Sequence, residues 1–130
     1  MRYILIVLLM LSTVKAKEVV DKRTGLMWQD EPKIVSLTQP KAVNYCEGLT
    51  LYGHKDWRLP TIDELKSIVD YSRPKDEVAI KTEFKHTQSS GYWTSSKVVD
   101  SSSFWVVGFD YGNDTWYYDS YSYYVRCVRQ

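Results

Sequence analysis

The sequence predicts a small α+β domain, with two helices in its first half and an antiparallel sheet in its second half. Two helix starts are each marked by a threonine close to a proline, at residues 38–40 and 60–61. From Tyr92 onward, apolar and polar residues alternate at a spacing of two, which is typical of half-buried strands. Helices followed by a run of strands indicate the α+β class.

The first predicted element is a hairpin. Glu18–Asp21 forms one short strand and Leu26–Gln29 forms the other, because each contains neighbouring apolar residues and the two are separated by turn residues. Gly25 can adopt the positive φ that such a turn requires. We therefore expect the chain to enter the domain through a short antiparallel pair.

The first predicted helix begins after Thr38, a residue type that caps helices, and carries Pro40 in its first turn. Its end is expected near Gly48. Its apolar side chains recur at helical spacing and form one stripe toward the core, which comprises Ala42, Val43, Tyr45, Cys46 and Leu49.

A corner precedes the second helix. Pro60 fixes its own φ and excludes the residue before it from the helical region. Thr61 and Glu64 are spaced as a capping box, so the helix is expected to begin at Ile62. It is predicted to run from Ile62 to Tyr71 and to end before Arg73-Pro74. Its buried residues are expected to be Ile62, Leu65, Ile68 and Val69.

Residues 75–90 mix charged and apolar side chains without a period, which predicts a long loop. The strands that follow are separated by turn clusters rich in Ser, Gly, Asn and Asp, the clearest of which is residues 110–114. The predicted strands are Tyr92–Ser96, Ser103–Phe109, Thr115–Tyr118 and Tyr123–Arg129. The strands at the two ends of the domain are expected to lie side by side.

The N-terminus has the pattern of a secretory signal. Arg2 precedes an apolar run from Ile4 to Leu11, and Val14-Lys15-Ala16 places small residues where a signal peptidase cleaves. A membrane anchor is the alternative, but the run is shorter than the roughly 20 apolar residues that span a bilayer. We predict a signal peptide at residues 1–16, a domain at residues 17–130, and a periplasmic or secreted protein without stable membrane insertion.

The charge balance excludes one class of partner. The chain has 17 basic and 16 acidic residues, and removal of Arg2 and Lys15 leaves 15 − 16 = −1. A nearly neutral protein has no global attraction for nucleic acid or for an anionic membrane. Neither is expected as a partner.

Four segments carry a resemblance to a known family: Asp21–Gln29, Gly53–Leu65, Gly91–Ser96 and Tyr124–Arg129. In this order and spacing they resemble the bacterial DUF1566 family, the domain at the C-terminal end of the Legionella collagen-like adhesin. The resemblance extends from about Val19 to Arg129. It implies a C-type-lectin-like fold, distantly similar to that of formylglycine-generating enzymes. It also implies an adhesive role and glycosaminoglycan-type binding.

The two cysteines, Cys46 and Cys127, have two interpretations. In an exported protein an even cysteine count indicates a disulfide, and the lectin resemblance implies such a bond between the first helix and the last strand. The alternative is a catalytic thiol pair, as in the formylglycine-generating relatives, but no metal ligands accompany the cysteines. We predict the structural disulfide.

Residues typical of catalysis do not form a recognisable site. His54 and His86 are far apart in the sequence and are expected at the surface, and no nucleophile motif surrounds them. The acidic pairs Asp63-Glu64 and Asp76-Glu77 are adjacent residues, which point apart on a helix. We therefore expect no enzyme activity and no cofactor.

Calcium is the metal to consider, because lectin-like folds often bind it. Oxygen ligands are available at Asp110, Asn113, Asp114 and Asp119. The same residue types occur in hairpin turns for backbone reasons alone. Moreover, Glu31-Pro32-Lys33 departs from the sugar-binding lectin motif and lies too early in the chain. We predict no metal site.

The C-terminal tail is the predicted binding surface. Tyrosine and tryptophan combine flat apolar faces with a polar edge, and they are enriched where proteins bind ligands. The tail contains Tyr111, Trp116, Tyr117, Tyr118, Tyr121, Tyr123 and Tyr124. Because strand side chains alternate between faces, some of these rings must pack in the core. The predicted ligand-binding residues are Tyr111, Asn113, Asp114, Trp116, Tyr118 and Tyr121.

Two functional hypotheses follow for this surface. The first is recognition of a glycan or another envelope or extracellular ligand, including sulfated polysaccharide. The second is docking of a protein partner, as a periplasmic accessory subunit or inhibitor. The other tryptophans, Trp28, Trp57, Trp93 and Trp105, are expected in the core. Asp56 and Arg58 are expected to brace the corner around Trp57 from inside.

Overall fold

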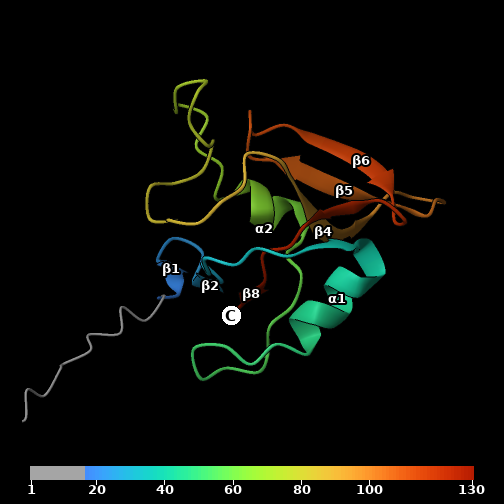
Figure 1. Ribbon diagram of the computed structural model, residues 1–130, viewed down its shortest axis with the longest axis horizontal. Coiled ribbons are helices and arrows are strands. Elements are labelled where there is room, and N and C mark those ends of the chain that lie inside the picture. The colour runs from blue at the N-terminus through green and yellow to red at the C-terminus, as the bar shows by residue number, and fades with distance from the viewer. Residues whose placement is uncertain (1–16) are drawn as a thin grey trace, which may run out of the picture.

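The computed structural model describes residues 17–130, which form two helices and two sheets (Figure 1). The predicted signal peptide, residues 1–16, lies outside the described residues. The elements are β1 (Val19–Asp21), β2 (Leu26–Trp28), β3 (Ser36–Thr38), α1 (Gln39–Glu47), α2 (Ile62–Lys66), β4 (Gly91–Lys97), β5 (Ser103–Gly108), β6 (Asp114–Tyr118), β7 (Ser122–Tyr124) and β8 (Val128–Arg129). The α+β class is confirmed. Within residues 17–130, no helix has the length and apolar character needed to span a bilayer.

The strands form two sheets, whereas one curled antiparallel sheet was predicted. One sheet has the order β1-β2-β8 and the other has the order β3-β7-β4-β5-β6. The larger sheet is mixed, because β4 and β7 pair in parallel at Tyr92 and Tyr124. The terminal strands do not lie side by side, since β2 pairs with β1 on one edge and with β8 on the other.

The predicted last strand, Tyr123–Arg129, is broken into β7 and β8, which belong to different sheets. The break occurs at residues 125–127, where three consecutive side chains are buried. Val125 donates its backbone N–H to Val35, Arg126 turns toward Asp30, and Cys127 bonds to Cys46 of α1. These tertiary contacts replace the sheet pairing that a continuous strand would make.

Helix α1 begins as predicted, with Thr38 at the N-cap and a proline in the first turn. The Thr38 side chain makes no capping hydrogen bond. Thr38 also ends β3, a strand that the sequence pattern did not predict. Ala42 and Cys46 of the predicted stripe are completely buried. The helix thus packs one face against the larger sheet.

Helix α2 has the predicted capping box. The backbone N–H of Glu64 donates to Thr61 Oγ1 at 3.2 Å, and that of Thr61 donates to Glu64 Oε1 at 2.9 Å. The predicted end at Tyr71 is wrong, since the helix stops at Lys66. Residues 68–70 pair instead with the segment around Ile80: Asp70 donates to the Ala79 carbonyl at 3.1 Å and Lys81 donates to the Ile68 carbonyl at 3.0 Å. Apart from this short pairing, residues 75–90 form a loop without helix or strand, as expected.

Two apolar clusters cover opposite faces of the larger sheet. Tyr92 and Val107 pack with Leu65 of α2 and with Ile68, which follows the helix, in a cluster that also includes Trp28. The neighbouring residues Trp93 and Val106 point the other way and pack with α1, Trp57 and the disulfide. Trp28, Trp57 and Trp93 are buried as predicted, but Trp105 is only half-buried because it lies one strand from the open edge at β6.

Candidate binding surface

The predicted binding residues lie on β6 and on the turns that flank it. Strand β6 is the last strand of the larger sheet and pairs only with β5, so one of its edges is open in the described part of the chain (Figure 1). Four large side chains of this region are more than half exposed: Tyr111, Trp116, Tyr118 and Tyr121. The fold therefore leaves the aromatic tail largely accessible to a ligand.

Alternation along β6 divides this surface into two faces. Trp116 and Tyr118 lie on the α2 side of the sheet, and their rings meet edge to face with centroids 6.5 Å apart. Tyr118 also stacks on Tyr121, with centroids 6.4 Å apart and planes 24° apart. These three rings form an exposed outer row.

The α1 side of β6 carries a second set of rings, which is anchored in the core. Tyr117 lies against Tyr123 at a centroid distance of 4.6 Å. Tyr123 in turn meets the buried ring of Trp93 at 5.2 Å, and Trp93 Nε1 donates to the Leu37 carbonyl at 2.8 Å. Burial raises the pKa of Tyr123, and the adjacent Tyr117 hydroxyl raises it further. Both rings are thus half-buried and held in fixed positions.

A groove of about 360 Å³ opens beside these two tyrosines. Its volume falls within the range of about 300–1,000 Å³ found for small-molecule sites. Its floor is formed by Gly91, Val106 and Gly108. Its walls are formed by Tyr117, Tyr123 and Thr115 on one side and by Ser90 and the turn residues Asp110, Tyr111 and Asn113 on the other.

The two glycines of the floor are cross-strand partners in β4 and β5. A Cβ on Gly91 would lie 2.7 Å from Val106 Cγ1 and 2.9 Å from a ring carbon of Tyr123. A Cβ on Gly108 would lie 2.5 Å from the Asp110 carboxylate. Larger residues would therefore displace the ring and the carboxylate that line the groove. Glycine inside a strand is typical of places where another group approaches closely.

The structure separates the six residues predicted to bind ligand. Tyr111 and Asn113 line the groove, whereas Trp116 and Tyr118 lie on the other face. Asp114 also points to the α2 side, where its carboxylate is 3.6 Å from Lys66 Nζ. Tyr121 contacts rings of both faces, with centroids 6.0 Å from Tyr117 and 6.4 Å from Tyr118.

Of the residues that form the groove walls, the sequence-based site included only Tyr111 and Asn113, and it included none of the floor. Tyr117 and Tyr123 were noted as part of the aromatic tail but not assigned to the site. The period-two spacing could have placed Tyr117 on the opposite face from Trp116 and Tyr118. The signal for the floor was Gly91 and Gly108 within predicted strands.

The calcium ligands considered from the sequence are not gathered into a site. Within residues 17–130, no group of three or more His, Cys, Asp or Glu side chains is placed to hold a metal ion. Asp114 faces Lys66, and Asp110 Oδ1 accepts the backbone N–H of Tyr111 at 2.9 Å. Asp110 and Asp114 therefore each have a protein partner of their own.

The sequence of the described residues identifies the family. Residues 17–129 match the family described as the Lcl C-terminal domain, which leaves only Gln130 of the described residues unmatched. This chain belongs to the Lcl C-terminal domain family. The resemblance of the four sequence segments is thereby confirmed. No curated protein matches the chain.

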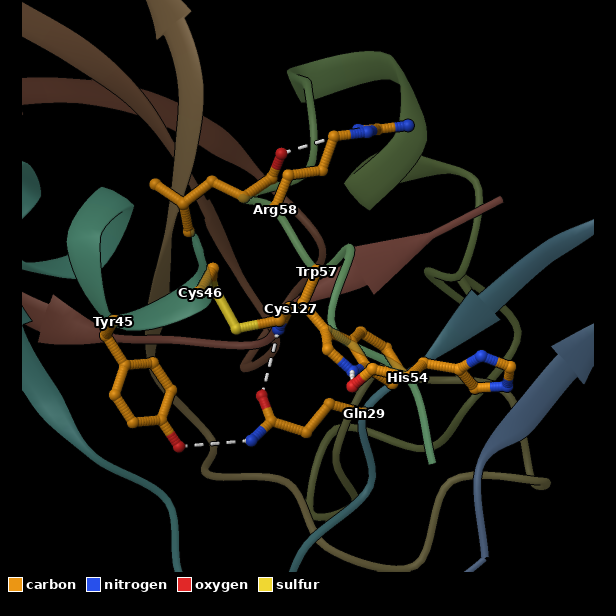
Figure 2. The surroundings of a disulfide bond; sticks show 8 residues. Gln29, Tyr45, Cys46, His54, Trp57, Arg58 and Cys127 are labelled. Atoms are coloured by element: carbon orange, nitrogen blue, oxygen red, sulfur yellow. Dashed lines mark hydrogen bonds between the residues drawn. A yellow bond between two sulfur atoms is a disulfide. The ribbon is translucent and has the colours of Figure 1, made fainter. Parts of the chain in front are cut away.

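In this Lcl C-terminal domain, Cys46 and Cys127 form the predicted disulfide, with their Cα atoms 5.5 Å apart. Figure 2 shows Gln29 beside it: Gln29 Oε1 accepts the Cys127 N–H at 3.0 Å, and its Nε2 donates to the Tyr45 hydroxyl at 3.2 Å. Both cysteines and Gln29 are buried. The bond therefore lies in the core between α1 and the C-terminal segment, and neither cysteine is free.

The remaining predicted polar residues hold the fold of the Lcl C-terminal domain. Arg58 pairs with Glu64 at 2.6 Å and so braces the corner, but from a partly exposed position and not from inside. Asp56 is not internal, because its exposed carboxylate pairs with Arg129 of β8 at 2.5 Å. His54 and His86 are partly exposed. Their backbones are held in place, because the carbonyl of His54 accepts the Trp57 indole N–H at 3.1 Å and the N–H of His86 donates to Asp30 at 3.0 Å.

Proposed function

We propose that this domain is an exported, non-catalytic recognition module that binds carbohydrate through its C-terminal aromatic surface. The observation that carries the proposal is the open row of Trp116, Tyr118 and Tyr121 on the edge of the sheet. Membership of an adhesin-like domain family supports a recognition role. The engagement of both cysteines in a disulfide supports the absence of thiol chemistry.

Carbohydrate suits this surface for a chemical reason. The C–H faces of a pyranose ring are apolar and pack on aromatic faces, while its hydroxyls need hydrogen-bonding partners at the rim. On the α2 side, the outer row supplies apolar ring faces and tyrosine hydroxyls. On the α1 side, Asn113 and Thr115 supply polar groups beside the tyrosines of the groove. Sulfated polysaccharide, which the adhesin resemblance implied, is the charged variant of the same ligand class. A lectin-like fold is supported by the disulfide that ties α1 to the C-terminal segment.

The experiment is an array of neutral and sulfated glycans, including glycosaminoglycans, probed with the purified protein with and without a chelator. We expect specific binding that the chelator does not reduce. Trp116→Ala should weaken binding to long polysaccharides while the melting temperature stays nearly constant. A folded sample that binds no glycan would contradict the proposal.

Export is a separate part of the proposal. Disulfides form and persist in oxidising compartments, so the Cys46–Cys127 bond supports passage through the inner membrane. Cleavage after Ala16 would leave Lys17 as the first residue. N-terminal sequencing of the protein from periplasmic and secreted fractions should give Lys17, and recovery of an intact Met1 only from the cytoplasm would contradict export.

The open edge of β6 favours a second candidate function, the binding of a protein partner. An unpaired strand edge presents backbone N–H and C=O groups to which an extended peptide can add a strand. The two candidate functions predict different results in a competition experiment. A soluble glycan should displace a bound glycan ligand, but it should leave a polypeptide that pairs with β6 bound. Competition with array-positive oligosaccharides during envelope pull-downs would distinguish them.

A further inference from the structure

The groove on the α1 side contains no basic side chain. Of its ten lining residues, only Asp110 carries a charge near neutral pH, and that charge is negative. Its Oδ1 accepts the Tyr111 N–H, and the carboxylate lies over the position where Gly108 lacks a Cβ. A sulfate or carboxylate group in this groove would meet a like charge without a compensating cation. The lining therefore disfavours an anionic ligand.

Two wall residues of the groove, Tyr117 and Tyr123, are packed in place before any ligand arrives. Tyr117 is fixed by Tyr123, and Tyr123 is fixed by the buried Trp93. Rings that are already held in place lose little conformational freedom on binding, so more of the contact energy appears as affinity. The outer row of Trp116 and Tyr118 is more exposed, since both rings are more than half accessible.

The floor and rim match the two surfaces of a sugar ring. Val106 and the ring of Tyr123 lie where Gly91 has no Cβ, and they give the groove an apolar surface close to the backbone. Asn113 and Thr115 are exposed at the rim, and each can donate to or accept from a hydroxyl. The carboxylate of Asp110 adds a strong acceptor.

We infer that this groove is the primary saccharide site of the domain and that it takes one end of an uncharged oligosaccharide, not a sulfated one. The inference rests on the proposed carbohydrate function and narrows its ligand class. The outer row then contacts additional sugar units of long chains only. Short oligosaccharides depend on the groove alone.

The first test compares neutral oligosaccharides of two to four residues with their sulfated counterparts, by array and then by calorimetry on the best neutral probe. We expect the neutral forms to bind and sulfation to weaken binding. Raising the salt from 0.05 to 0.5 M should change the affinity by less than about twofold, because screening acts only on charged ligands. Binding of sulfated forms alone, with affinity that falls with salt, would overturn the inference while preserving the carbohydrate function.

The second test fills the groove. Thr115→Met places a longer side chain at an exposed position of β6 and should reduce affinity for the neutral probe at least about tenfold. Asn113→Ala removes one hydrogen bond and should reduce it by about twofold to tenfold. Ser36→Met on the opposite edge strand and Asn44→Ala on α1 are matched exposed controls that should bind as the wild type does.

Thermal melts of all four variants establish that they fold. If the array detects neutral glycans but folded Thr115→Met binds them normally, the site assignment is wrong and the proposed function stands. If Trp116→Ala abolishes binding of the short probe, the outer row is the primary site and the inference is also wrong. If no glycan of either class binds the folded wild type, the proposed function fails first.

Discussion

Arg126 and Asp30 form an ion pair that is almost completely buried, with Arg126 Nη1 3.3 Å from Asp30 Oδ1. The two carboxylate oxygens also accept the backbone N–H groups of Lys85 and His86, at 2.9 and 3.0 Å. The guanidinium group donates to the carbonyls of Gln29 and His86 and lies 4.8 Å from the Phe84 ring centroid. One pair of side chains therefore joins the end of β2, the long loop and the segment between β7 and β8.

Breaking this pair is predicted to be costly. Arg126→Met leaves the Asp30 carboxylate buried without its cation, and loss of one partner of a buried pair typically costs about 3–5 kcal/mol. Arg73→Met is the matched control, because Arg73 pairs with Glu77 near the surface at i,i+4, where about 0.5 kcal/mol is expected. Urea denaturation measures both. Adding Asp30→Asn to Arg126→Met should recover part of the lost stability. If the losses of the two single variants simply added in the double variant, the two side chains would not be coupled.

The structural features that the sequence predicted correctly depend on short-range interactions. The hairpin at Gly25, which has a φ of 74°, and the capping box of Thr61 and Glu64 are local, so residue type and spacing suffice to find them. The end of α2 and the break after Tyr124 depend on partners distant in the sequence. Arg126 and Asp30, for example, are 96 residues apart.

The candidate surface was predicted only in part for the same reason. The exposure of Trp116 and Tyr121 agrees with the expected aromatic tail. The groove depends on how β4, β5 and β7 align: Gly91 pairs with Gly108, and Tyr123 packs beside them. Sequence periodicity gives the face of each side chain but not the register between strands, so it could not identify the groove.

The disulfide is predicted to stabilise the domain strongly. Cys46 and Cys127 are 81 residues apart, and closing a loop of that length is worth about 4 kcal/mol in the chain-entropy model. Replacing both residues with alanine, or reducing the bond, should lower the urea midpoint. Adding reductant to the double alanine variant serves as the control and should have no further effect. A wild-type melting temperature that is insensitive to reductant, with complete reduction verified by thiol titration, would contradict the prediction.

The pair formed by Arg58 and Glu64 is predicted to make stability depend on pH. The hydrogen bonds from Arg58 hold the pKa of Glu64 below its usual value. A lowered folded-state pKa contributes stability above the unfolded pKa near 4.5, and this contribution is lost as the pH falls through the folded pKa. Because both side chains are partly exposed, Arg58→Met should cost only about 0.5–1 kcal/mol at pH 7.

The pH dependence of that difference is the measurement. The gap in unfolding free energy between the wild type and Arg58→Met should be constant from pH 7 to about pH 5 and should shrink below about pH 4. Asp21 and Asp70, whose pKa values are also lowered, titrate in both proteins and cancel in the comparison. A gap that widens in acid would have the wrong sign for this mechanism.

Trp116 and Trp93 are predicted to contribute very different amounts to the stability of the domain. Trp93 is fully buried, supports Tyr123 and donates to the Leu37 carbonyl, so Trp93→Ala should cost about 3–5 kcal/mol. Trp116 is 51% exposed on an edge strand, so Trp116→Ala should cost less than about 1 kcal/mol, the value of a cross-strand contact. Denaturation curves give both values, and polysaccharide binding by the same samples separates function from folding. A loss for Trp116→Ala as large as that for Trp93→Ala would make Trp116 a structural residue and remove the outer row from the binding surface.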